Sequence, residues 1–405
     1  MEESADAAEE KGDIMNQSRE YNKTLYACFI GYIVQAVVNN FVPLLFLTFQ
    51  NQYQIPLGKI AMLITVNFGL QLLIDLASVG FIDRIGYRAS AVLAHVCSAA
   101  GLILLTILPE LFRDPFTGIL LAVMIYAVGG GLLEVLVSPI VESCPTENKE
   151  KAMSILHSFY CWGHVGVVLF STLFFHLSGT ENWKILALLW AVIPAANGIF
   201  FCKVPVPQPG EDGEPGLTLR ELAGKKVFWI FILLMLCAGA SEQAVSQWAS
   251  AFAEKGLGVD KTVGDLAGPM AFAVLMGSSR AFYGKYGEKI NLERFMICSG
   301  ILCILSYLVI SLVPVPVISL AGCALCGLSV GILWPGTFSM ASAEVKGGGT
   351  AMFALLALAG DLGCSAGPGL AGAVSGYFGD NLHAGILAAV IFPVLLLAGI
   401  GWKRK

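Results

Sequence analysis

The chain has 405 residues, of which 56% are hydrophobic and only 13% are charged, whereas about a quarter of the residues in a soluble protein are charged. Its net charge of −5 is small and is not concentrated in a single-sign run. This composition excludes most soluble enzymes, and no nucleic-acid partner is expected.

The chain begins with an acidic, polar stretch, residues 1–24, that lacks the basic start and short apolar core of a signal peptide. We interpret it as a disordered cytoplasmic tail. Beyond it, the apolar residues form blocks that are each about 20 residues long, the length that a helix needs to cross the hydrocarbon core. The twelve predicted spans are 25–49, 58–81, 89–108, 117–141, 152–177, 184–203, 227–252, 262–283, 294–313, 317–341, 350–376 and 384–402.

One connection is longer and more polar than the others. Residues 204–226 contain the sequence PVPQPGEDGEPG, which predicts a flexible cytoplasmic linker. The linker separates an N-terminal six-helix bundle, 25–203, from a C-terminal one, 227–402, and residues 403–405 form the C-terminus. The predicted fold class is an all-α membrane protein with twelve transmembrane helices in two pseudo-symmetric bundles.

The distribution of basic residues predicts the orientation. Of the 24 Lys and Arg residues, all but five lie at the termini or in the connections that follow every second span. Because positive charge marks the cytoplasmic side, both termini are expected in the cytoplasm. The short loops favour a bacterial inner membrane. The five exceptions are Lys59, Arg113, Lys184, Lys255 and Lys261.

The eleven cysteines are scattered through apolar runs, and the one close pair, Cys323 and Cys326, has no histidine or second pair nearby. We interpret them as small buried hydrophobic residues rather than as disulfides or metal ligands. No cofactor and no metal are expected.

The two halves are similar in sequence, which indicates an internal duplication. Such a duplication is typical of transporters whose halves rock around a site at the membrane midplane. Three matches, at offsets of 201, 200 and 199 residues, pair segment 80–88 with 281–289, 131–134 with 331–334, and 152–153 with 351–352.

The connection between spans two and three reads Gly80-x-x-Asp83-Arg84-x-Gly86-x-Arg88. In a twelve-span chain, this pattern resembles the signature loop of the major facilitator superfamily, and the resemblance covers residues 25–402. It implies the major facilitator fold and a gating role for these five residues, in which the charged pair holds the cytoplasmic side closed in one state. The alternative is an ordinary positively charged loop.

Two further stretches resemble the fucose-permease branch of sugar:proton symporters. They are Gly129-Gly-Gly-Leu-Leu-Glu134 in span four and Ala238-Gly-Ala-Ser-Glu242 in span seven. This resemblance implies proton coupling through Glu134. In fucose permease a carboxylate of span one works with the glutamate of span four, whereas here Asn39 and Asn40 occupy that region.

Ionisable side chains at membrane depth are costly and usually face a water-filled pathway. Glu134 lies mid-span with no basic residue in its helix, which makes it the candidate proton carrier; the alternative is a protonated structural glutamate. In span seven, Glu242 is accompanied by Gln243, Gln247 and Trp248. The two glutamines lie one helical turn apart, and with the aromatic ring they predict a surface for sugar hydroxyls and C–H groups.

Other candidates lie in spans one, two, five, ten and eleven. His157 and His164 share a helical face with Tyr160, and Trp162 lies nearby. Asn39, Asn40, Asn67 and Gln71 offer neutral hydrogen bonds, with interhelical packing as the alternative. Trp334, before Pro335, is a candidate gate or substrate plate, and Asp361 a candidate cavity residue. We expect Asp75 to contact the signature loop. The predicted substrate-binding residues are Asn39, Asn40, Gln71, Glu134, His157, Trp162, Glu242, Gln243, Gln247, Trp248, Trp334 and Asp361.

The leading hypothesis is a monomeric transporter that moves a monosaccharide or related polyol across the plasma membrane by alternating access, with proton symport through Glu134 as an added hypothesis. The alternatives are an efflux transporter of amphipathic compounds and a membrane nutrient sensor that binds without transport. The Gly–Pro motif typical of drug antiporters in span five is replaced here by Gly163 and Gly166, which disfavours drug export. No nucleophile–base pattern or phosphate-binding loop indicates an enzyme.

Overall fold

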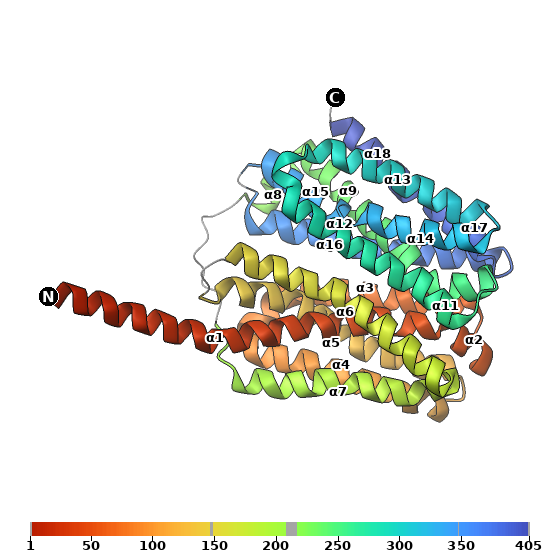
Figure 1. Cartoon of the computed structure of the whole chain (residues 1–405), viewed down its shortest axis with the longest axis horizontal. Coiled ribbons are helices and arrows are strands. Elements are labelled where there is room, and N and C mark those ends of the chain that lie inside the picture. The colour runs from red at the N-terminus through yellow and green to blue at the C-terminus, as the bar shows by residue number, and fades with distance from the viewer. Residues whose placement is uncertain (1, 146–148, 208–216, 347, 404–405) are drawn as a thin grey trace.

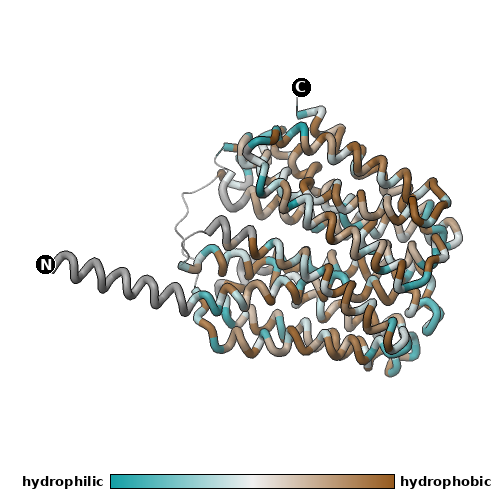
Figure 2. The backbone as a smooth tube through the Cα atoms, in the orientation of Figure 1, coloured by the Kyte–Doolittle hydropathy of each residue, from teal (hydrophilic) through white to brown (hydrophobic). Residues whose placement is uncertain are grey.

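The computed structural model describes residues 2–145, 149–207, 217–346 and 348–403, and every regular element within these ranges is a helix. The predicted all-α membrane fold is confirmed. Eleven of the described helical segments are long and apolar enough to cross a membrane. Hydrophobic residues follow the lengths of the helices, and polar residues gather at the helix ends (Figure 2).

Two bundles of helices lie side by side, with α1–α7 in one and α9–α18 in the other (Figure 1). The elements of the N-terminal half are α1 (Glu2–Asn40), η1 (Val42–Leu45), α2 (Phe46–Tyr53), α3 (Leu57–Ile85), α4 (Tyr87–Leu111), α5 (Pro115–Ser143), α6 (Lys149–Ser178), η2 (Thr180–Asn182) and α7 (Trp183–Lys203). Those that follow are α8 (Leu219–Ala223), α9 (Lys226–Ser246), α10 (Ala249–Ala251), η3 (Phe252–Gly256), α11 (Lys261–Asp265), η4 (Leu266–Met270), α12 (Ala271–Tyr286), η5 (Gly287–Lys289), α13 (Leu292–Leu312), α14 (Pro316–Val330), α15 (Leu333–Glu344), α16 (Gly349–Tyr377), α17 (Leu382–Ala389) and α18 (Ile391–Lys403).

The predicted eighth span, 262–283, is the one of the twelve without a counterpart among the eleven membrane-length helical segments. The chain is nevertheless helical from Lys261 to Tyr286, through α11, the π-helical turn η4 and α12. The irregular turn contains Pro269, whose missing N–H removes a hydrogen bond from the helix. Together the three elements supply the twelfth membrane crossing.

Two segments differ from the sequence prediction. Because α1 begins at Glu2, the tail predicted to be disordered is helical, consistent with its many alanine and glutamate residues, which favour helix. In the linker, Leu219–Ala223 forms α8, which Thr218 and Glu221 cap with reciprocal hydrogen bonds. Residues 208–216 of the predicted flexible linker lie outside the described residues.

Two sets of helices join the bundles. α3 packs on α16, where the Ser365 hydroxyl donates a hydrogen bond of 3.1 Å to the backbone oxygen of Thr65. α6 packs on α11, η4 and α12, and a Cβ placed on Gly277 of α12 would lie 3.5 Å from Cys161 of α6. The groups that lie along these two contacts can therefore sense the relative position of the halves.

Glycines allow α9 and α16 to approach closely inside the C-terminal bundle. A Cβ at Gly363 would lie 2.0 Å from the backbone oxygen of Leu236, and one at Gly367 would lie 2.4 Å from that of Ala240. Because backbone atoms cannot move away as a side chain can, only glycine fits at these positions. The glycines of α16 therefore permit the close approach of α9.

We expect the substitution Gly363→Ala to destabilise the protein by about 1–3 kcal/mol, the typical penalty for overpacking. The measurement is the melting temperature of the detergent-purified protein. Gly166→Ala in α6 is the matched control, because nothing lies within 4 Å of its added Cβ. Equal melting temperatures for the two variants would contradict the close α9–α16 contact.

Candidate functional site

A chain of buried amides joins α1, α3 and α5. Gln35 donates from Nε2 to Gln71 Oε1 at 2.9 Å and to Glu134 Oε2 at 3.2 Å. Gln71 and Asn67 both donate to Asn39 Oδ1, at 2.9 and 3.1 Å. The structure thus brings the predicted Asn39, Asn67, Gln71 and Glu134 together, and adds Gln35, which sequence reasoning missed. Gln35 lies four residues before Asn39 and so on the same face of the helix, and this spacing could have identified it from the sequence.

Three carboxylates meet at the end of this chain. Oxygen atoms of Asp75 (α3), Glu134 (α5) and Asp361 (α16) all lie within 4.8 Å of one another, and Asp75 and Asp361 are hydrogen-bonded. The prediction that Asp75 contacts the signature loop is therefore wrong; this residue lies in the carboxylate cluster. Asp361 lies within the continuous helix α16.

Glycines of α5 position this carboxylate cluster. A Cβ at Gly131 would lie 3.0 Å from the Gln71 backbone, and one at Gly130 would lie 3.1 Å from the Gln71 amide. The absence of side chains at these positions lets α3 approach α5 until Asp75 and Glu134 face each other. Asp361 then reaches the same point from the other half of the molecule, across the α3–α16 contact.

Three neighbouring carboxylates in a low-dielectric interior cannot all carry charge, because their mutual repulsion adds to the cost of desolvation. Protons or a bound cation must neutralise them. Their oxygens also suit a hard metal cation, although none was expected from the sequence. The cluster combines groups from both halves, so its stability depends on how far apart the halves are.

A buried ion pair lies at the other contact between the bundles, where α12 packs on α6. Arg280 of α12 donates to Glu242 Oε2 of α9 at 3.2 Å, to Cys161 Sγ of α6 at 3.3 Å and, from Nε, to the backbone oxygen of Gly331 at 3.2 Å. That oxygen lies four residues before Pro335, which has no N–H to donate to it. The proline therefore leaves free an acceptor that Arg280 uses.

Arg280 was missed by sequence reasoning because it was counted among the cytoplasmic positive charges. It nevertheless lies inside the predicted eighth span, 262–283, and a basic residue at membrane depth was the signal that could have identified it. Glu242, in contrast, was chosen as a candidate from the sequence, and the structure gives its partner, Arg280.

The two glutamines of α9 are hydrogen-bonded as their spacing predicts. Gln247 Nε2 donates to Gln243 Oε1 at 3.0 Å and to the backbone oxygen of Asn39 at 3.1 Å, and Gln243 donates to Glu242 at 3.3 Å. The second of these bonds joins α9 to α1 of the other half. Asn40 is buried and donates to the Ala36 oxygen of its own helix at 2.9 Å.

Trp248 does not form an open plate beside these glutamines. Its side chain is fully buried, its Nε1 donates to the Pro368 oxygen at 3.0 Å, and its ring lies 5.2 Å from that of Phe46. In this conformation it closes the interface between the halves, where a solute cannot reach it.

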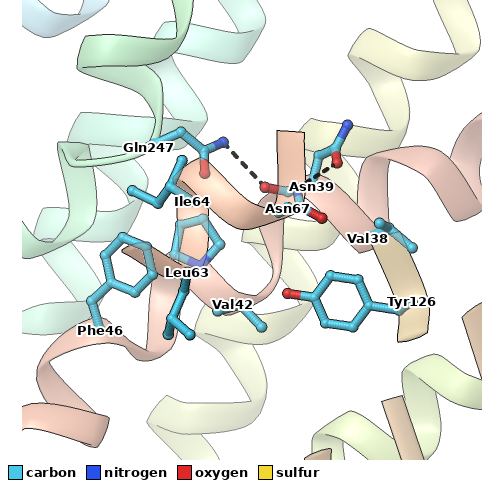
Figure 3. Close-up of a pocket in the computed structure, with 10 residues that line it drawn as sticks. Val38, Asn39, Val42, Phe46, Leu63, Ile64, Asn67, Tyr126 and Gln247 are labelled. Atoms are coloured by element: carbon cyan, nitrogen blue, oxygen red, sulfur yellow. Dashed lines mark hydrogen bonds between the residues drawn. The ribbon is translucent and has the colours of Figure 1, made fainter. Parts of the chain in front are cut away.

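A small cavity of about 10 Å³ lies next to Gln247, lined by Asn39, Asn67 and Tyr126 among others (Figure 3). Such a volume accommodates about one water molecule and excludes a sugar. The dashed line between Gln247 and Asn39 in Figure 3 marks the hydrogen bond that joins α9 to α1 beside it.

Polar contacts close one end of the interface. Asp380, between α16 and α17, accepts hydrogen bonds from Lys255 at 2.9 Å and from Gln50 of α2 at 3.0 Å. Lys261 donates to the Leu44 oxygen at 2.9 Å and forms salt bridges with other residues of the C-terminal half. The halves are therefore tied together at the end that contains α2 and the α16–α17 connection.

The interface is more open away from this closed end. His157 contacts Tyr32 of α1, with ring centroids 5.5 Å apart, yet its side chain is exposed. Glu134 and Trp334 are half-buried, and Trp334 packs over Gly360, where a Cβ would lie 2.2 Å from its ring. These side chains are within reach of a solute that enters between the halves.

The histidines and Trp162 of α6 do not form one site. His164 is buried and His157 exposed. Trp162 is 58% exposed, and it lies five residues from His157, which places it about 140° around the helix. The structure thus leaves Trp162 outside the group of residues that line the interface.

The signature loop is described in part. The surroundings of Gly80 and the side chain of Asp83 lie outside what the structure describes. Gly86 adopts φ 84° between α3 and α4, a conformation that favours glycine. Arg84 is exposed, and Arg88 donates to the Val204 oxygen at 2.9 Å, which joins the loop to the start of the linker. Because the side chain of Asp83 is not among those described, the predicted gating role of the loop stays a prediction.

A family model described as Major Facilitator Superfamily matches residues 27–368. No curated protein sequence matches significantly. Among solved structures, a bacterial homologue of the human lysosomal transporter Spinster, inward-facing and occupied, is 13% identical with a TM-score of 0.76, covering 95% of this chain and 97% of that one.

Two Escherichia coli proteins are also similar. The fucose:proton symporter FucP is 16% identical with a TM-score of 0.65, over 95% of this chain and 100% of its own. The xylose transporter XylE is 13% identical with a TM-score of 0.75, over 96% and 98%. At such identities the likeness shows the fold.

The ion pair leads to a prediction about stability. Arg280→Gln leaves Glu242 without its cation, and breaking a buried pair costs about 3–5 kcal/mol; we expect about 2–4 kcal/mol here because the Arg280 side chain is 25% exposed. The double variant Glu242→Gln/Arg280→Gln should recover at least half of the lost melting temperature. A double variant as unstable as Arg280→Gln would show that the pair is not the main source of the loss.

Proposed function

Because the chain belongs to the major facilitator superfamily, we propose that it is a secondary active transporter that moves a small polar solute across the membrane by alternating access. The proposed solute is a monosaccharide or related polyol. The chain is a membrane transporter and not an enzyme. The observation that carries the proposal is the carboxylate cluster, because residues of both halves build it at membrane depth.

The polar lining supports a hydroxyl-rich solute. Glu134 and Trp334 are half-buried, His157 is exposed, and Gln243 lies next to the Glu242–Arg280 pair. Hydroxyl groups need both donors and acceptors, and these side chains supply both. Two proteins of similar structure, a fucose:proton symporter and a xylose transporter, act on solutes of this class.

The carboxylate cluster supports proton symport, with Glu134 as the carrier. When Asp361 approaches Asp75 and Glu134, as it does here, at least one proton must be bound to limit repulsion. When the halves separate at this level, each carboxylate is rehydrated and can release its proton. Proton binding and the movement of the halves are then coupled, which is what a symporter requires.

In this proposal, the structure represents the inward-facing state. The end closed by Lys255, Lys261 and Asp380 belongs to segments predicted to lie outside the cell, and the linker and both termini to the cytoplasm. The protein would act as a monomer in the plasma membrane. The solute would leave past His157 and Trp334, while Trp248 and its neighbours block the outer side.

The proposal is tested by uptake of labelled hexoses, deoxyhexoses and polyols into proteoliposomes, with and without an inward proton gradient. We expect gradient-driven accumulation of one solute in the wild type. Glu134→Gln should reduce accumulation to the equilibrium level while solute exchange continues. The affinity for the solute should change by less than about fivefold, which corresponds to the net free energy of about one hydrogen bond.

The matched control is Glu142→Gln, which lies on the same helix and is exposed; it should accumulate solute like the wild type. Replacing sodium with choline in the buffer distinguishes a proton from a metal cation in the cluster. Uptake that responds neither to the gradient nor to Glu134→Gln would contradict coupling, and no uptake of any sugar or polyol would contradict the proposed solute.

A further inference from the structure

Arg280 is a cation within the helical bundle, where an unpaired charge is costly. The structure holds it by partners from three directions: Glu242 on α9, the Gly331 oxygen at the break between α14 and α15, and Cys161 on α6. His157 and Tyr160 of α6 are close enough to interact with it electrostatically. Its position is therefore fixed by both halves of the molecule.

The hydrogen bonds of Arg280 leave part of its binding capacity unused. A guanidinium has five N–H donors in a rigid fork; its three hydrogen bonds use one donor on each nitrogen. One of the three acceptors is a thiol, which accepts hydrogen bonds weakly. Since the side chain is 25% exposed, a solute between the halves can reach it.

We propose that Arg280 binds the carboxylate of the transported solute, which makes the substrate a sugar acid or a closely related polyhydroxy carboxylate. A carboxylate matches the guanidinium fork with two parallel hydrogen bonds. It would take the place of the weak Cys161 acceptor and engage the unused N–H groups. This inference rests on the proposed function and narrows its solute class.

The charge balance favours a single carboxylate over a phosphate. Glu242 already neutralises much of the Arg280 charge at 3.2 Å. In the part of the chain that the structure describes, the other salt-bridged cations among the helices close the outer end or lie at the cytoplasmic termini. A phosphate dianion would need further cations at the site. A carboxylate adds only one negative charge to the ion pair, half of what a phosphate dianion would add.

The position of Arg280 also connects substrate binding to the movement of the halves. Cys161 belongs to the N-terminal half and Arg280 to the C-terminal half, so their 3.3 Å contact crosses the interface. A carboxylate that replaces the thiol would remove this contact. Binding would thereby loosen one crossing contact of the inward-facing state and supply a differential interaction between states, as alternating access requires.

The first test needs no variant. Uptake by wild-type proteoliposomes is compared within matched pairs: gluconate and glucitol, glucuronate and glucose, galacturonate and galactose. We expect the acid of at least one pair to have a half-saturation concentration about tenfold or more below that of its neutral partner, the range of a charge-assisted hydrogen-bond pair.

Variants then assign the preference to Arg280. In the background of Glu242→Gln, which avoids leaving a buried carboxylate without its cation, Arg280→Gln should abolish the preference for the acid, and Arg280→Lys should retain part of it. Cys161→Ala should leave the affinity for the acid unchanged or increase it, because the thiol competes for the same donors. Arg220→Gln, an exposed position on α8, is the matched control and should behave like the wild type.

The outcomes separate this inference from the proposed function. Uptake of the neutral sugar alone, with an affinity that Arg280→Gln does not change, would overturn the inference and leave the sugar transporter intact. A preference for the acid that persists in Glu242→Gln/Arg280→Gln would also overturn it. Absence of uptake for every sugar and every acid would overturn both.

Discussion

The membrane interior offers no water to polar groups, and each polar atom placed there must find its partner within the protein. This constraint explains why the described ionisable side chains among the helices occur in groups. Gln35, Gln71 and Asn39 are joined in one chain that ends on Glu134, and Arg280 is paired with Glu242. Because several of these partners belong to opposite halves, satisfying them also fixes how the halves meet.

Glycine and proline supply the geometry that these pairings need. Glycines 130 and 131 bring α3 close enough to α5 for Asp75 to face Glu134. Pro335 leaves the Gly331 oxygen free for Arg280. Glycine permits the close helix approach because it has no side chain. Proline frees a backbone acceptor four residues earlier because it has no N–H.

The fold was predictable because its signals are local. Span length, basic residues in alternate connections and the repeat near 200 residues can be read without knowing which helices touch. The site was predictable only in part. Glu134 and Glu242 were identified as isolated acids, but the partners Asp75, Asp361 and Arg280 depend on helix rotation and crossing, which the sequence of one helix does not determine.

The same limit explains the aromatic residues. Trp162 and Trp248 both lie beside polar residues in sequence, and the structure places the first on the outer face of α6 and the second in the closed interface. Hydropathy cannot separate these cases, since both environments are apolar. What separates them is whether a helix face meets lipid or the other half.

The carboxylate cluster and the Arg280–Cys161 contact respond differently to the separation of the halves. Bringing the carboxylates together becomes costly when they are ionised, so proton loss at the cluster favours separation there. The thiol contact is weak and exchanges readily for a stronger acceptor, so an anionic solute favours its rupture. Proton binding at the cluster and solute binding at Arg280 would thus act on one interface at two points, which links them through the movement of the halves without direct contact.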